Sequence, residues 1–286
     1  MEMLKFSLYE LLPDLPPIEV LDVGANTLHG QRPPYLDLVL AGRARVTGFE
    51  PDLRGCVQLN HDYGRPHRFF PQFIGNGERA KFYETNTPFT GSLYPPNQPL
   101  LASFTDLAEV TALQRVHEVT TVRLDDVADI EDVDLIKIDI QGGELNAFRG
   151  AEKTLAAAVV IQTEAEFVEL YQGQPLFADI DAHLRSRGFW FHDFHDFGSR
   201  TLKPLRSPNA AGADQGMNQK LWTDAIYFKH PFRLEAVPDV KLLKLAVLLH
   251  DLYGSYDFVH FFLQAADARR GEQVAPRYRE RLTAAN

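Results

Sequence analysis

The chain has few of the features that mark several common protein classes. It contains a single cysteine, Cys56, in 286 residues, which excludes an intramolecular disulfide framework and a cysteine-rich zinc site. This composition suits a reducing compartment, and we predict a cytoplasmic protein. Basic residues are also few, because 29 Lys and Arg stand against 39 Asp and Glu, for a net charge of -10. That balance disfavours nucleic acid or an anionic membrane surface as a partner.

Long apolar runs are absent as well. The most apolar later stretch, Leu242 to Leu249, is interrupted by Lys244 and is far shorter than the roughly 20 residues that a bilayer requires. The first residues, MEMLKFSLYE, lack the charged head and apolar region of a secretion signal. The sequence therefore predicts a globular protein with neither a membrane span nor a secretion signal.

The first glycine turn lacks the triple-glycine fingerprint of dinucleotide-binding proteins. Ile18–Val23 is a short apolar run that breaks at Gly24-Ala25-Asn26, which is typical of a buried strand entering a tight turn. Tyr35–Ala41 is the expected helix, and Arg45–Phe49 is a second strand that ends on Glu50. This is the layout of a nucleoside-binding βαβ unit, in which the acidic residue accepts hydrogen bonds from a ribose diol.

The glycine count indicates which nucleoside the unit binds. With one glycine before Ala25-Asn26, the turn is poorly suited to a pyrophosphate. A ligand with a ribose and no phosphate fits better, and S-adenosyl-L-methionine is the commonest such cofactor. Any doubly wound protein has strand-glycine-helix turns, so Gly24 alone would not decide the matter. Its pairing with Glu50 at the end of the next strand favours ligand binding.

A second group of polar residues follows two later strands. Val133–Ile138 is an apolar run, and Asp139 and Gln141 stand where it ends, before Gly142-Gly143. Val159–Thr163 is the next core strand and is followed by Glu164. In an open α/β sheet, ligands bind outside the carboxyl ends of the strands near the switch point. We therefore expect Asn26, Glu50 and Asp139 to converge there.

The other expected elements complete an alternating α/β pattern. They are a third strand over Arg68–Ile74 despite Pro71, a hairpin arm at Lys81–Glu84, a loop over the site at Thr85–Asn97, a strand at Val119–Leu124, a helix over Gln174–Arg187, an aromatic strand at Phe189–His195, a long loop over 198–220, a final strand at Trp222–Phe228, and helices after Pro238.

Several short motifs, taken together, carry a family resemblance. They are Leu21–Asn26 (LDVGAN), Gly48–Pro51 (GFEP), Gly91–Leu93 (GSL), Leu135–Glu144 (LIKIDIQGGE), and Gln162–Glu164 (QTE) with Tyr171 and Gln174–Leu176. The set resembles the FkbM family of S-adenosylmethionine-dependent methyltransferases over residues 18–230. The resemblance implies a class I methyltransferase fold, which is a Rossmann-like, seven-stranded, mostly parallel sheet with helices on both faces. It also implies methyl transfer to a hydroxyl oxygen, commonly on a sugar or a polyketide-type natural product.

This resemblance gives a division of the chain. Residues 1–17 are an N-terminal lead-in, residues 18–230 are the methyltransferase domain, and residues 231–286 are a C-terminal helical extension that resembles no family known to us. Apolar residues recur at helical spacing from Leu242 to Phe262, which indicates either packing within the chain or the face of a homodimer.

The cofactor-binding residues are expected at the strand ends. Glu50 would hold the ribose hydroxyls, Gly24 and Asn26 would line the methionine end, and Ile74 or a neighbour would pack on adenine. The other candidate cofactor ligands are Asp22, Asp52, Ser92, Asp139 and Gln141.

The candidate bases are Asp139, Glu164, His192 and His195. An alcohol needs help to lose its proton, and histidine titrates nearest to pH 7. Each candidate also has a structural interpretation: Asp139 could brace the glycine turn, Glu164 could anchor the Tyr171 loop, and the histidines could face solvent or the core. His192, Asp193, His195 and Asp196 would fall on two faces of a strand, so we expect no metal site.

The methyl acceptor is expected to be a small molecule or a glycan. Two other functions remain open from the residues, an NAD(P)-dependent oxidoreductase and a non-catalytic binding protein with a methyltransferase fold. The joint presence of Asp22, Gly24, Glu50 and Asp139 favours an active enzyme.

Overall fold

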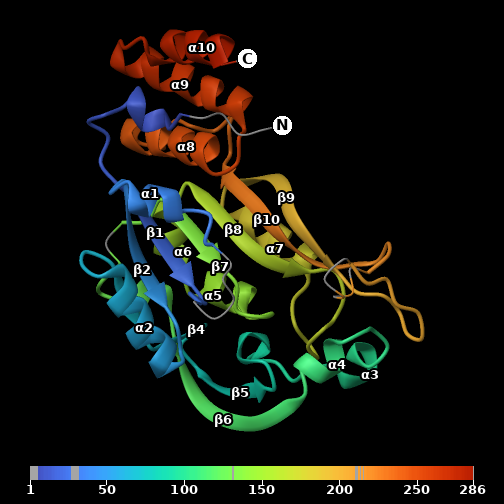
Figure 1. Ribbon diagram of the computed structural model, residues 1–286. Coiled ribbons are helices and arrows are strands. Elements are labelled where there is room, and N and C mark those ends of the chain that lie inside the picture. Colours follow the sequence, from blue (N-terminus) through green and yellow to red (C-terminus); the bar gives the residue numbers. More distant parts are fainter. Residues whose placement is uncertain are drawn as a thin grey trace.

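The computed structural model describes residues 6–26, 32–130, 132–209, 212, 214 and 216–285. Its main sheet has seven strands in the order β3-β2-β1-β7-β8-β10-β9 (Figure 1). Neighbours from β3 to β8 are parallel, whereas β10 runs antiparallel to both β8 and β9. The expected seven-stranded, mostly parallel sheet is confirmed. Its strands are β1 (Ile18–Val23), β2 (Ala44–Phe49), β3 (Arg68–Phe70), β7 (Leu135–Ile138), β8 (Val160–Glu166), β9 (Phe189–Ser199) and β10 (Lys220–Lys229).

Pro71 divides the third expected strand between two sheets. The prediction of one strand over Arg68–Ile74 is wrong, because β3 ends at Phe70 and β4 (Phe73–Ile74) belongs to a separate three-stranded sheet of order β4-β6-β5. Proline has no N–H to donate, so the ladder cannot continue through it. In the small sheet, β5 (Arg79–Thr85) pairs antiparallel with β6 (Leu113–Val122).

The two faces of the main sheet carry separate hydrophobic cores, because successive strand residues point to opposite faces. On one face, here called the α8 face, Val20, Val46 and Val160 pack against η1, α1, α2 and the C-terminal helices. On the other, Leu21 and Ile161 pack against α5, α6 and α7. These helices are η1 (Leu8–Glu10), α1 (Leu36–Leu40), α2 (Leu53–Tyr63), α5 (Glu144–Arg149), α6 (Glu152–Ala157) and α7 (Phe177–Ser186). Shorter helices are η2 (Pro88–Thr90), α3 (Gln98–Leu101), α4 (Leu107–Val110) and η3 (Leu124–Asp126).

Three helices end the chain and stack outward from the sheet in the order α8, α9, α10 (Figure 1). They are α8 (Asp239–Asp251), α9 (Tyr256–Arg270) and α10 (Val274–Ala285). Every residue from Lys241 to His250 is buried, so the apolar pattern of this segment serves packing within the chain. The division of the chain at residue 231 stays a prediction, and α8 shares one hydrophobic core with the sheet. In the described part of the chain, no helix combines the length and apolar character that crossing a membrane demands.

Candidate functional site

Polar side chains from five neighbouring strands line up along the carboxyl edge of the main sheet, on its α8 face. Asp22 on β1 pairs with Lys137 on β7, which pairs with Gln162 on β8. Two residues further along, Glu164 pairs with Asp224 on β10. Alternate residues of a strand share a face, so strand alternation brings distant parts of the chain together. We call the set the carboxyl-edge row: Asp22, Glu50, Lys137, Asp139, Gln162, Glu164 and Asp224.

Glu50 stands where β2 ends and is half-buried. Its Oε1 accepts from the N–H of Asp52 at 2.7 Å. Burial raises the pKa of Glu50 to about 7, and the carboxylates of Asp52 and Asp22 act in the same direction, while the hydrogen bond from Asp52 opposes them. A buried carboxylate among other carboxylates is stabilised by any hydroxyl that donates to it.

Strands β1 and β7 approach too closely at Gly24 for any side chain there. Gly24 has a φ of +82°, and an added Cβ would lie 2.0 Å from the carbonyl oxygen of Asp139. Beside it, Asp22 is 3% exposed and accepts a hydrogen bond from the hydroxyl of Tyr35. Its other oxygen, Oδ1, is buried without a hydrogen-bond partner and lies 3.6 Å from Nζ of Lys137. The glycine turn is therefore a tight backbone cradle beside an unsatisfied carboxylate oxygen.

Other predicted cofactor ligands have local structural tasks. Oδ2 of Asp52 accepts from the N–H of Gly55 at 2.7 Å and so caps α2. Ile74 is 4% exposed within the hydrophobic core, which leaves adenine almost no surface on that side chain. Asn26 is exposed beside residues 27–31, which lie outside the described part of the chain. The roles of these residues toward the cofactor stay predictions.

Gln141 joins the acidic side chains of β7 and β8. Its Nε2 donates to Oδ1 of Asp139 at 3.0 Å and to Oε2 of Glu164 at 2.7 Å. Its Oε1 lies 3.0 Å from the hydroxyl of Tyr171, and its carbonyl accepts from Ser92 Oγ at 2.6 Å. Gln141 has a φ of +57°, a conformation that side chains disfavour by roughly 1–2 kcal/mol. These contacts hold the strained turn, so Gln141 and Ser92 position the carboxylates.

Three glutamates beside Asp139 are buried without a matching number of cations. Burial raises the pKa of Glu144 to about 7. Burial, followed by the charge of Asp139 and of the other glutamates, raises the pKa of Glu164 and of Glu166 well above the ordinary value. One oxygen of Glu144 and one of Glu166 are buried without a hydrogen-bond partner. Burial therefore favours the neutral acid at Glu164, which makes Asp139 the better candidate for the base.

Lys137 is a member of the row that the sequence analysis did not single out. Its Nζ lies 3.6 Å from Oδ1 of Asp22 and 4.0 Å from Oδ2 of Asp139. Burial opposes its charge, but Asp22, Asp139, Asp224 and Glu164 together raise its pKa above the ordinary value. The amine therefore stays protonated and can hold an oxygen but cannot accept a proton. The signal in the sequence was a lysine inside an otherwise apolar strand.

The two candidate histidines have different surroundings. Nε2 of His192 lies 2.5 Å from Oγ of Ser255, and its ring packs against Phe228 and Phe258. Burial lowers its pKa. His195 is largely exposed and pairs with Asp224 at the end of the row. The structure thus brings His195 to the row and turns His192 toward the C-terminal helices. Among the described residues, no three His, Cys, Asp or Glu side chains are grouped to hold a metal.

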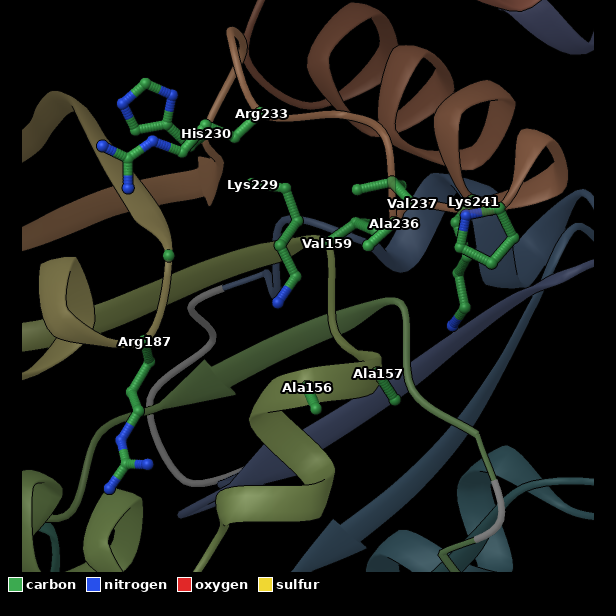
Figure 2. Close-up of a pocket in the computed structure, with 12 residues that line it drawn as sticks. Ala156, Ala157, Val159, Arg187, Lys229, His230, Arg233, Ala236, Val237 and Lys241 are labelled. Atoms are coloured by element: carbon green, nitrogen blue, oxygen red, sulfur yellow. The ribbon is translucent and has the colours of Figure 1, made fainter. Parts of the chain in front are cut away.

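A pocket of about 210 Å³ lies at the opposite, amino edge of the sheet, beside Val159 and Lys229 (Figure 2). Its cationic side chains end in separate places rather than at one point (Figure 2). Nζ of Lys229 donates to the carbonyl of Leu155 at 2.9 Å, and Nζ of Lys241 binds Asp134 at 2.7 Å. These cations serve the fold, so we place the candidate site at the carboxyl-edge row.

Comparison with known proteins identifies the family. The family described as "Methyltransferase FkbM domain" matches residues 22–191. The chain belongs to the FkbM methyltransferase family. This membership confirms the expected methyltransferase class and S-adenosyl-L-methionine as the cofactor, and it decides against the oxidoreductase alternative.

This FkbM methyltransferase has a curated relative and several structural neighbours. It is 30% identical over 176 residues to the 2-O-methyltransferase NoeI of Sinorhizobium fredii (strain NBRC 101917 / NGR234), which is 57% of this chain and 69% of that protein. Magnesium protoporphyrin IX methyltransferase (ChlM) from Synechocystis PCC 6803 with bound SAM has a TM-score of 0.39 at 12% identity, covering 78% of this chain and 76% of that one. The N-terminal domain of EvdMO1 with SAH bound has a TM-score of 0.35 at 8% identity, covering 78% and 77%.

The residues of this FkbM methyltransferase fit an adenosyl sulfonium. A ribose diol supplies two O–H donors, which a partly buried Glu50 beside other carboxylates can accept. The orphaned Oδ1 of Asp22 and the close backbone at Gly24 form a negatively charged cradle that suits a cationic ligand. Below, the donor side means Glu50 and Asp22 of the row together with the nearby Gly24, and the acceptor side means Asp139, Glu164 and Asp224; these two roles are proposals.

Proposed function

We propose that this protein transfers a methyl group from S-adenosyl-L-methionine to a hydroxyl oxygen of a sugar, a glycan or a polyhydroxylated natural product. Membership of the FkbM family and the similarity to a 2-O-methyltransferase support this proposal. The observation that carries it is the carboxyl-edge row, because strand pairing sets Asp22, Lys137, Gln162, Glu164 and Asp224 on one face of the sheet.

The donor side of the row binds and orients the cofactor. Bound S-adenosylmethionine supplies a methyl group activated by its sulfonium. Glu50 accepts hydrogen bonds from the ribose hydroxyls, while Gly24 and Asn26 line the methionine end. Gln141 and Ser92 act indirectly, because they fix the turn that carries Asp139. Since the pKa of Glu50 is about 7, its ribose-binding form becomes more populated as the pH rises from 6 to 8.

On the acceptor side, Asp139 and Lys137 both bind the hydroxyl that is methylated. Asp139 would accept the proton of that hydroxyl, and the ammonium of Lys137 would stabilise the developing negative charge on its oxygen. The bound sulfonium would supply the methyl group and leave as a neutral thioether when its carbon–sulfur bond breaks. The separation of 4.0 Å between Asp139 and Lys137 lets both reach one hydroxyl. Alignment of donor and acceptor can supply about 7–11 kcal/mol, whereas a positioned base typically gives about 10²–10⁴-fold. Placement by the row therefore matters more than the base alone.

A methyl-transfer assay tests this proposal. Purified protein with methyl-labelled S-adenosylmethionine is screened against free glycosides, nucleotide sugars and oligosaccharides, each beside a matched deoxy analogue. We expect label on at least one hydroxylated acceptor and none on the analogue that lacks the reacting hydroxyl. Asp139→Asn should lower turnover by about 10²–10⁴-fold with cofactor affinity retained. Cofactor binding without transfer to any acceptor would favour the non-catalytic alternative, and label on nitrogen or sulfur would contradict O-methylation.

A further inference from the structure

We infer that the turn between α8 and α9, residues 252–255, forms one side of the acceptor site, where Tyr253 is a positioning residue that sets Asp224 against the acceptor's hydroxyls. This inference rests on the proposed function and deepens it. The turn lies outside residues 22–191, which match the family, so family membership assigns nothing to it.

A chain of hydrogen bonds links the turn to the row. The hydroxyl of Tyr253 donates to Oε1 of Gln162 at 3.0 Å, and Nε2 of Gln162 donates to Oδ2 of Asp224 at 2.7 Å. Gln162 is 4% exposed, and both ends of its amide are engaged. An amide that accepts at one end and donates at the other has one orientation, so the tyrosine hydroxyl decides which end of Gln162 faces Asp224.

The turn itself is held in place from three sides. Oγ of Ser255 lies 2.5 Å from Nε2 of His192 on β9, and the N–H of Ser255 donates to the carbonyl of Leu249 at 3.0 Å. Just before the turn, Asp251 accepts from Oγ of Ser7 at 2.5 Å and from the N–H of Leu8 at 2.9 Å. Because the turn is anchored to β9, α8 and the N-terminal segment, it can orient a side chain for binding.

Asp224 is suited to bind a hydroxyl. Gln162 occupies its Oδ2, and among the described residues its Oδ1 makes no hydrogen bond. Burial raises its pKa, as does Asp139, whereas the hydrogen bond from Gln162 and the charges of Lys137 and His195 lower it. Glu164 pairs with it across the strands, and Tyr253 faces it from the C-terminal extension.

These contacts give the turn a task in acceptor recognition. Asp139 and Lys137 handle the reacting hydroxyl, and Asp224 accepts a hydrogen bond from a second hydroxyl of the same molecule. The substrate class is therefore a polyol or sugar with at least two hydroxyls near each other, rather than a lone alcohol or phenol. The C-terminal extension fixes the second contact and so contributes to specificity.

The test compares Tyr253→Phe with Tyr278→Phe. The second variant removes another buried tyrosine hydroxyl of the same extension, which lies 3.0 Å from Nδ1 of His250 and far from the row. The first readout is a carbon-13 carboxyl titration of Asp224, assigned with Asp224→Asn, in protein without acceptor. In Tyr253→Phe, Gln162 loses its anchor and donates less well, so the pKa of Asp224 should rise. Tyr278→Phe should leave that pKa unchanged. Equal titration of wild type and Tyr253→Phe, or equal shifts in both variants, overturns the positioning role.

The second readout is kinetic. With an acceptor from the methyl-transfer screen, Tyr253→Phe should raise the acceptor KM about tenfold, the effect of one hydrogen bond, and leave S-adenosylmethionine affinity unchanged. An acceptor with a single hydroxyl should show no such rise. An unchanged acceptor KM overturns the specificity role. Because the titration needs no acceptor, a shifted pKa without any methyl transfer would refute the proposed reaction and leave the positioning of Asp224 intact.

Discussion

The two edges of the main sheet differ in how their buried carboxylates are partnered. At the amino edge, Asp134 is fully buried, and its carboxylate binds Nζ of Lys241 at 2.7 Å, Nζ of Lys244 at 2.6 Å and the N–H of Glu19 at 2.8 Å. At the carboxyl edge, carboxylate oxygens of three side chains are buried without a hydrogen-bond partner, those of Asp22, Glu144 and Glu166.

This difference separates a structural region from the region of the proposed site. The amino edge fixes α8 to the sheet, because Lys241 and Lys244 both pair with Asp134. The carboxyl edge holds carboxylates close together, with Lys137 as the cation among them, and such groups are costly to bury unless something else binds them. Ligands that donate hydrogen bonds or carry positive charge can offset part of that free-energy cost. The buried carboxylates without partners at the carboxyl edge therefore support a binding site there.

The largest expected effect comes from removing Asp134, the carboxylate that pairs with two lysines at the amino edge. Asp134→Ala leaves Lys241 and Lys244 buried without their carboxylate, and removing one partner of a buried ion pair typically costs about 3–5 kcal/mol. We expect a loss of this size in the free energy of unfolding, measured in urea. Asp134→Ala with both lysines changed to methionine should recover most of it. A loss below about 1 kcal/mol would show that the amino edge is not held by this carboxylate.

The next effect is a pH dependence that arises at the carboxyl edge. The pKa of Glu144 and of Glu50 is about 7 in the folded protein and 4.5 ordinarily. The folded state therefore holds these protons more tightly than the unfolded state. Their contribution is fully present below about pH 4.5 and is lost as the pH rises through 7, on the order of 3 kcal/mol for Glu144. Unfolding at pH 5, 6, 7 and 8 should show this decline, and Glu144→Gln should reduce it. A flat profile contradicts the unmatched state of this edge.

The smallest expected effect on the free energy of unfolding comes from Glu166→Gln, an isosteric change at the carboxyl edge. Burial raises the pKa of Glu166 well above its ordinary value and so favours the neutral acid, whose shape is similar to that of glutamine. Glu166→Gln should change the free energy of unfolding at pH 7 by less than about 1 kcal/mol. The matched change at the other edge, Asp134→Asn, should cost several times more. Equal losses for the two variants, measured in parallel in urea, would remove the distinction between the edges.

From the sequence, Asp22, Gly24 and Glu50 were easier to place near one another than Lys137, Gln162 and Asp224. Asp22 lies in β1, Gly24 follows β1 and Glu50 follows β2, all within a single βαβ unit, so spacing along the chain was enough to link them. Lys137, Gln162 and Asp224 lie on strands whose register depends on pairing across the sheet, which one sequence does not reveal.

Two further features lay outside the reach of local patterns. The break of the third strand at Pro71 decides which sheet β4 (Phe73–Ile74) joins, and the sequence showed the proline without showing the second sheet. The contact of Tyr253 with Gln162 joins residues 91 positions apart. Helical periodicity predicted the C-terminal helices and could not place the turn between them against the row.

We propose that the carboxyl edge binds S-adenosylmethionine through Glu50, and calorimetry at pH 8 measures this contribution. Wild type and Glu50→Ala are titrated with the cofactor, and Glu166→Gln is the control, because it changes a buried carboxyl group of the same edge that is not assigned to the ribose. Loss of two hydrogen bonds to a charged group, at about 1.5–3 kcal/mol each, predicts binding at least about 100-fold weaker for Glu50→Ala and unchanged for Glu166→Gln. Equal affinity of wild type and Glu50→Ala would contradict the claim.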